Sequence, residues 1–91
     1  MRNTERKDNI IVFLLENLEN YLNHNTSIPC YFYYNTEKKV LTIEEVADED
    51  KTILFFNKIS QDYLIDKLLL LLNNKDLLNN FNDFELFRLI F

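Results

Sequence analysis

The residues best able to do chemistry are five acids within seven positions, Glu44, Glu45, Asp48, Glu49 and Asp50. Carboxylates can ligate divalent cations, act as general acid and base, or present negative charge to a basic partner. A calcium loop needs oxygen ligands on alternate residues and a later bidentate acid, and this run lacks that spacing. Carboxylates crowded on a turn are also solvated, without the burial that separates the pKa values of a catalytic pair. The run therefore predicts either a solvated connector or a surface facing a basic partner.

Other reactive residues give no stronger site. Acid-x-lysine matches at residues 49–51 and 37–39 resemble part of a metal-dependent nuclease, but such matches arise by chance in a charged chain and no second acid supports them. His24 and Cys30 are each unique and fall short of the four ligands of a structural zinc site. We interpret His24 as a helix-terminal residue and Cys30 as a small core residue at a strand start. The sequence predicts no enzyme, no catalytic residue, no cofactor and no metal ligand, with the nuclease kept as an alternative.

Composition limits the class of protein. The chain has no glycine, which excludes the P-loop, the dinucleotide fingerprint and the nucleophile elbow, because these loops need glycine's freedom at positive φ. A hydrophobic share of 47% at a net charge of −5 predicts a folded chain, and 91 residues predict a single domain over residues 1–91. One cysteine, no recognisable signal peptide and apolar runs as short as those at 10–15 and 68–72 favour an intracellular, cytoplasmic setting without a membrane span.

Hydrophobic periodicity predicts the order of elements. Apolar residues at three- and four-residue steps over residues 4–24 predict an amphipathic helix. Aromatic and β-branched residues at 30–34 and 39–46 predict a β-hairpin, and residues 52–56 predict a third strand. In the second strand, alternation turns Leu41 and Ile43 towards one face and Thr42 towards the other.

The C-terminal third is predicted to be helical. Ser60 is expected to cap a helix that runs to about Asn73, whose apolar stripe is widened by Leu69 and Leu70. Asp76 or Asp83 could cap one last helix or two short ones, although the alternation over residues 84–91 also permits a strand. The predicted fold is α+β: an N-terminal amphipathic helix, a three-stranded antiparallel meander, then two C-terminal helices packed on one face of the sheet.

Charge is distributed unevenly along the chain. Residues 44–50 carry −5 by themselves, and residues 8–37 contain four acids but no lysine or arginine. Aromatic residues at 31–34 could stack bases, yet base-stacking platforms lie in basic grooves, and a pI near 4.7 disfavours direct nucleic-acid binding. The two acidic zones instead predict attraction to a basic protein.

These patterns support two main hypotheses. The first is a small acidic, non-enzymatic inhibitor or regulator that binds a basic partner, such as a nucleic-acid-binding complex, through the acids at 44–50. By class analogy alone, small acidic glycine-poor α+β proteins of A/T-rich phages and mobile elements include anti-defence inhibitors such as anti-CRISPR proteins. The second is a homodimeric structural or regulatory domain. Its self-association patch would consist of Leu69, Leu70, Phe84, Phe87, Ile90 and Phe91.

Overall fold

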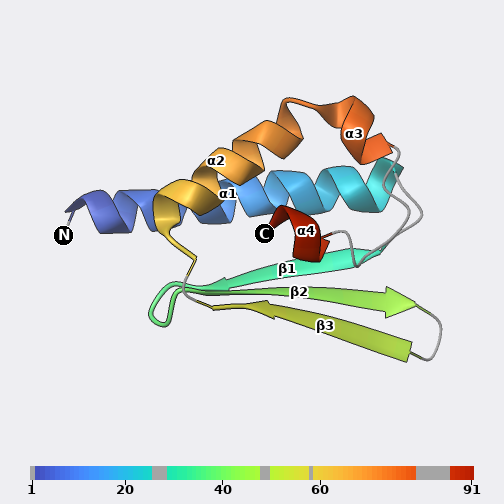
Figure 1. Cartoon of the computed structure of the whole chain (residues 1–91), viewed down its shortest axis with the longest axis horizontal. Helices are drawn as coiled ribbons and strands as arrows, with labels where there is room; N and C mark the ends of the chain where they lie inside the picture. The colour runs from blue at the N-terminus through green and yellow to red at the C-terminus, as the bar shows by residue number, and fades with distance from the viewer. Residues whose placement is uncertain (1, 26–28, 48–49, 58, 80–86) are drawn as a thin grey trace.

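The helices lie on one face of a three-stranded antiparallel sheet (Figure 1). The computed structural model describes residues 2–25, 29–47, 50–57, 59–79 and 87–91. Within this part, the order of elements is one long helix, three strands, a second long helix and two short helical segments. The α+β class and the antiparallel sheet predicted from the sequence are confirmed.

Helix α1 spans Arg2–Asn25 and matches the predicted helix to within two residues at either end. Its apolar residues recur at helical spacing, so they form one stripe along the helix. The buried members of that stripe are Ile11, Leu14, Leu15, Leu18 and Leu22. Because this stripe faces the sheet and α2, α1 is held along most of its length by the core.

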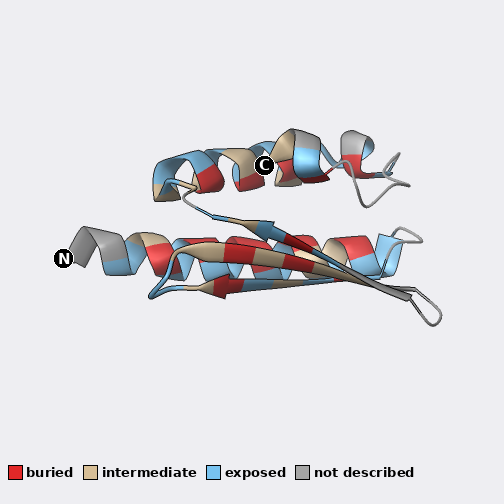
Figure 2. Cartoon of the chain, turned by 60° about the horizontal axis from the view of Figure 1, so that its bottom comes forward, coloured by how far each residue is buried: buried red, intermediate tan, exposed pale blue. Residues whose placement is uncertain are grey.

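The sheet consists of β1 (Cys30–Asn35), β2 (Val40–Ala47) and β3 (Asp50–Phe56), in the order β1-β2-β3. Leu41 and Ile43 of β2 are fully buried while Thr42 between them is only half-buried, as the alternation predicted. Buried residues accordingly alternate with more exposed ones along the strands (Figure 2). The third strand begins two residues earlier than expected, because Asp50 pairs with Ala47 at the end of β2.

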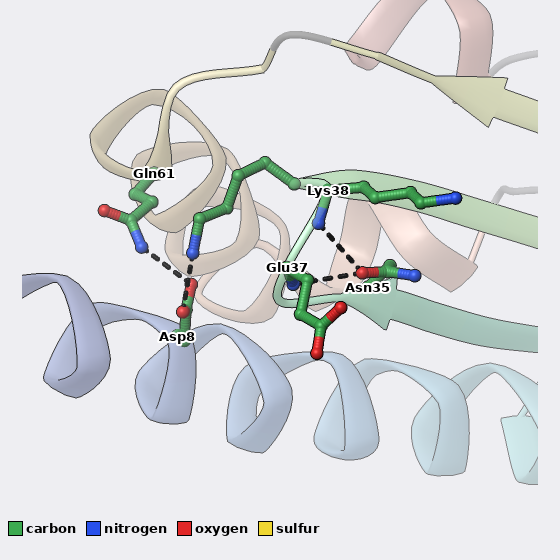
Figure 3. Close-up of polar contacts among 6 residues, drawn as sticks. Asp8, Asn35, Glu37, Lys38 and Gln61 are labelled. Carbon is green, nitrogen blue, oxygen red and sulfur yellow. Dashed lines mark hydrogen bonds and ion pairs between the residues drawn. The ribbon is translucent and has the colours of Figure 1, made fainter.

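The turn between β1 and β2 is built without glycine (Figure 3). The Asn35 side-chain oxygen accepts hydrogen bonds from the backbone N–H groups of Glu37 and Lys38, at 3.0 and 2.9 Å. Lys39 then takes a positive φ of 57°, a left-handed conformation that costs a residue with a Cβ atom more than it costs glycine. The turn thus fixes the hairpin register by a side-chain cap and one strained residue.

Helix α2 spans Gln61–Leu72 and confirms the predicted helix. The Ser60 hydroxyl accepts a hydrogen bond of 3.1 Å from the Tyr63 backbone N–H, which satisfies one of the free donors at the helix start. The three buried residues of α2 are Leu64, Leu68 and Leu71, on one stripe. Asn73 closes the helix through its backbone N–H, which bonds to the Leu69 carbonyl at 2.9 Å.

The prediction of two C-terminal helices is wrong. The described residues form one long helix before the sheet and one after it, followed by α3 (Lys75–Asn79) and α4 (Phe87–Ile90), which are only five and four residues long. Segments this short are unstable as free helices, so tertiary packing of Leu78 and Phe87, both fully buried, holds them in place. Helix rather than strand is confirmed for 87–90, whereas residues 80–86 lie outside the described part.

The core is a single cluster shared by all the long elements. The α4 residue Phe87 packs edge-on against Phe32 of β1, with ring centroids 5.4 Å apart, and stacks on Phe91. Fully burying side chains of this size contributes about 1.5–3 kcal/mol each. Within the described residues, no helix is both long enough and apolar enough to cross a membrane.

Candidate functional site

A groove runs between α1 and β1. Its volume is about 340 Å³. The residues that line it are Val12, Leu15, Glu16, Glu19, Phe32, Tyr33 and Tyr34. Carboxylates therefore come from the helix side and aromatic residues from the strand side.

Two polar side chains of α1 bond the backbone of β1 at the start of the groove. Asn23 accepts from the Cys30 backbone N–H at 2.8 Å and donates to the Cys30 carbonyl at 2.9 Å. Glu19 accepts from the Phe32 backbone N–H at 2.7 Å through its Oε1 atom. These bonds show that the backbone groups of Cys30 and Phe32 face away from β2 and towards α1.

The same alternation continues to Tyr34. Backbone groups of every second residue in an antiparallel edge strand face away from the sheet, so the carbonyls of Phe32 and Tyr34 face the groove side. Among the described residues, no donor is bonded to either carbonyl. The groove thus offers hydrogen-bond acceptors.

No described residue neutralises the negative charge of the groove. Within the described part, neither Glu16 nor Glu19 forms an ion pair with a lysine or arginine. The reason lies in the sequence, because residues 8–37 contain no lysine or arginine at all. Carboxylates beside carbonyl oxygens make the groove complementary to a cation.

Beyond one end of the groove, Asp8 joins three elements (Figure 3). Its carboxylate is mostly buried and accepts from Lys39 Nζ of the hairpin turn at 2.7 Å and from Gln61 Nε2 of α2 at 2.7 Å. Burial first, and then the nearby Asp8 charge, raise the pKa of Tyr34 above its ordinary value. Asp8 is satisfied by these partners, so its role is to position α1 against the sheet.

The predicted acidic run does not form one surface in the described residues. Glu44 and Glu45 are adjacent in β2 and therefore point to opposite faces of the sheet. Glu44 shares the outer face with Tyr31 and Ile53, its neighbours in register, while Glu45 shares the helix face with Cys30. Asp50 begins β3 but its side chain is outside the described part, as are Asp48 and Glu49 entirely.

The predicted self-association residues are also separated. Leu69 and Leu70 are exposed on α2, but Phe87 is fully buried and the half-buried Phe91 packs against Phe87. Ile90 is also half-buried against the core, and Phe84 lies outside the described residues. Among the described members of that predicted patch, Leu69 and Leu70 are the exposed ones.

Cys30 and His24 have the surroundings expected of structural residues. Burial, followed by the charges of Glu45 and Glu19, raises the pKa of the Cys30 thiol to about 12, so this thiol is protonated at neutral pH. His24 lies in the last turn of α1, where its Nδ1 atom is 2.7 Å from the Asn20 carbonyl oxygen. Over the described ranges, no group of three or more potential metal ligands comes together.

Sequence reasoning missed the groove as a site, although its charge signal was visible. The absence of cations over residues 8–37 marked an acidic zone, but only the packing of α1 beside β1 places Glu16 and Glu19 next to strand backbone. Comparisons with known proteins add no candidate: no family model, curated protein or solved structure matches the chain.

Proposed function

We propose that this protein is a non-enzymatic interaction module that inhibits or regulates a basic partner protein, and that the groove between α1 and β1 receives a cationic side chain of that partner. The observation that supports the proposal is the groove itself, which is lined by Glu16 and Glu19 and borders strand carbonyls to which no described residue donates, with no cation of the described chain paired to either carboxylate.

Arginine fits this chemistry best. A guanidinium carries five N–H donors and no acceptor, and a groove lined by carboxylate and carbonyl oxygens can accept several of them at once. Its flat, weakly hydrated face also packs well beside aromatic residues such as Phe32 and Tyr33. The cavity of about 340 Å³ has room for one such side chain and its hydration water.

The acids at Glu44, Glu45, Asp48, Glu49 and Asp50 are assigned a steering role in this proposal. A net charge of −5 attracts a basic protein from a distance and raises the rate of encounter more than the final affinity. Proteins that bind nucleic acids typically have a basic surface, so the proposed partner could be a nucleic-acid-binding complex. An anti-defence inhibitor is one biological role consistent with such a partner.

The proposal is tested by titrating ¹⁵N-labelled protein with an arginine-rich peptide of about ten residues, as a stand-in for the partner, and following amide shifts. Shifts are expected over residues 12–19 and 32–34, which line the groove. The double variant Glu16→Gln/Glu19→Gln should weaken binding about tenfold or more, a loss of about 1.4 kcal/mol.

The matched control is Glu5→Gln/Glu37→Gln, because both of these glutamates are exposed and do not line the groove. Both double variants have the same net charge, so a purely long-range effect would weaken them equally. Equal weakening would therefore overturn the groove as the binding site. Changing the five acids at 44–50 to lysine takes the net charge from −5 to +5 (−5 + 10), so the association rate should fall and should rise with added salt instead of falling with it.

Self-association through α2 is the second candidate. Leu70 is 51% exposed and lies next to the exposed Leu69, so α2 presents two apolar side chains to solvent in addition to its buried stripe. The variant Leu70→Lys should then abolish a dimer seen by light scattering, whereas a wild-type monomer would rule this candidate out.

A further inference from the structure

The outer edge of β3 carries backbone groups that are directed out of the sheet. The backbone groups of Phe32 face outward from β1, so those of its register partner Ile43 face away from β1 and towards β3. Ile43 therefore bonds to Leu54, which lies opposite it in β3. The backbone groups of Ile53 and Phe55, on either side of Leu54, then face away from β2. In Figure 1, β3 is the border of the sheet on the side away from α1.

No described residue covers this edge. The sheet ends at β3, and among the described residues no hydrogen bond is made to the outward backbone groups of Ile53 or Phe55. The side chains of the same two residues lie on the outer face of the sheet, where Phe55 is 63% exposed. An open edge strand with exposed apolar side chains is a ready template for another strand.

We propose that this edge binds a second copy of the chain, so that two β3 strands pair antiparallel about a two-fold axis at Leu54 and the two sheets become one. In this register Ile53 of each copy lies opposite Phe55 of the other. Each pair exchanges both backbone hydrogen bonds, which satisfies the outward groups of both residues in both copies. On the outer face, each pair also joins a β-branched side chain to an aromatic one, a favourable cross-strand combination.

A second copy fits this edge for two reasons on the strand itself. The register is self-complementary, since a two-fold axis at Leu54 places the outward groups of Ile53 in each copy opposite those of Phe55 in the other. Residues 52–57 carry no charge, so no charged side chain of β3 itself lies between the two copies at the centre of the contact.

The experiment is sedimentation equilibrium of the full chain over about 1 µM to 1 mM, combined with amide exchange at both ends of that range. A dimer is expected, with slow exchange of the Ile53 and Phe55 amides that becomes fast on dilution. The Leu54 amide should stay protected at both concentrations, because it bonds within one copy. A monomer throughout the range would overturn the proposal, whatever other protein the edge could bind.

The test variant is Phe55→Lys, which should raise the dimer dissociation constant about tenfold or more. Its matched control is Tyr33→Lys, because Tyr33 lies on the same outer face, is 65% exposed and belongs to β1 instead of β3. The control should leave the dimer intact. Loss of the dimer in Tyr33→Lys or Leu70→Lys, or a wild-type dimer without dilution-dependent exchange at Ile53 and Phe55, would place the contact elsewhere and overturn the β3 edge.

Discussion

The two edges of the sheet are finished in different ways. At β1, side chains of α1 reach the strand backbone, with Asn23 bonding Cys30 and Glu19 bonding Phe32. At β3, no described residue bonds the outward groups of Ile53 and Phe55. One edge is therefore partly capped by the chain's own helix, which leaves carbonyl acceptors at Phe32 and Tyr34 in the groove, and the other is open to another strand. The comparison teaches that edge protection here depends on where α1 lies, not on the composition of the strands.

The largest expected effect comes from loosening the helix that closes β1. Leu18 is fully buried on α1, so Leu18→Ala should lower the free energy of unfolding by about 2–5 kcal/mol, measured by urea denaturation. The matched control Val12→Ala removes apolar atoms from a partly exposed site on the same helix and should cost far less. Similar losses in the two variants would show that the buried stripe does not anchor α1.

A second effect depends on pH and on Cys30 at the closed edge. The folded thiol has a pKa of about 12 against an ordinary value of 9.0, so between these values the unfolded chain has lost a proton that the folded chain keeps. The free energy of unfolding should therefore be unaffected by this group below pH 9 and fall by about 1.4 kcal/mol per pH unit between pH 9 and 12. Cys30→Ala should flatten this part of the curve, and an unchanged slope would contradict the assignment.

Opening the β1 edge alone should have a smaller effect. Asn23→Ala removes the two Asn23 hydrogen bonds to the Cys30 N–H and carbonyl, at a cost of about 1–3 kcal/mol, and should speed exchange of the Cys30 amide. Asn20→Ala, one turn earlier on α1, is the control, because no hydrogen bond of the described chain involves its side chain. If the two variants lost equal stability, the cap would not protect the edge.

The smallest expected change separates the two roles of Glu19. Gln keeps a side-chain oxygen for the Phe32 N–H but removes the charge, so Glu19→Gln should alter stability by less than about 0.5 kcal/mol. The affinity of the Glu19→Gln variant for an arginine-rich peptide should nevertheless fall. A variant that lost stability and kept full affinity would show that the carboxylate serves the edge and not the groove.

Local patterns predicted the elements well where one face is buried. The helical stripe of α1, the alternation around Leu41 and Ile43, and the Ser60 cap each follow from spacing or side-chain chemistry that acts within a few residues. The C-terminal third was less predictable because α3 and α4 are too short to be set by their own periodicity. Their positions depend on where Leu78 and Phe87 find the core.

The candidate site was harder to predict than the fold. A run of acids is conspicuous in sequence, yet Glu44 and Glu45 alternate across a strand and do not act together on one face. Glu16 and Glu19 are unremarkable helix residues until α1 packs beside β1. Likewise, nothing local distinguishes the protected strand from the open one, since both are rich in aromatic and apolar residues.

The burial of Cys30 gives the molecule a built-in reporter. Its thiol is fully covered and protonated, so a thiol-specific reagent can react only after an opening of the core exposes it, such as movement of α1 away from β1. Because this is the only cysteine in the chain, the labelling rate would measure how often that helix opens, without any engineered probe. A partner seated in the groove should slow the reaction, and a contact confined to β3 should leave it unchanged.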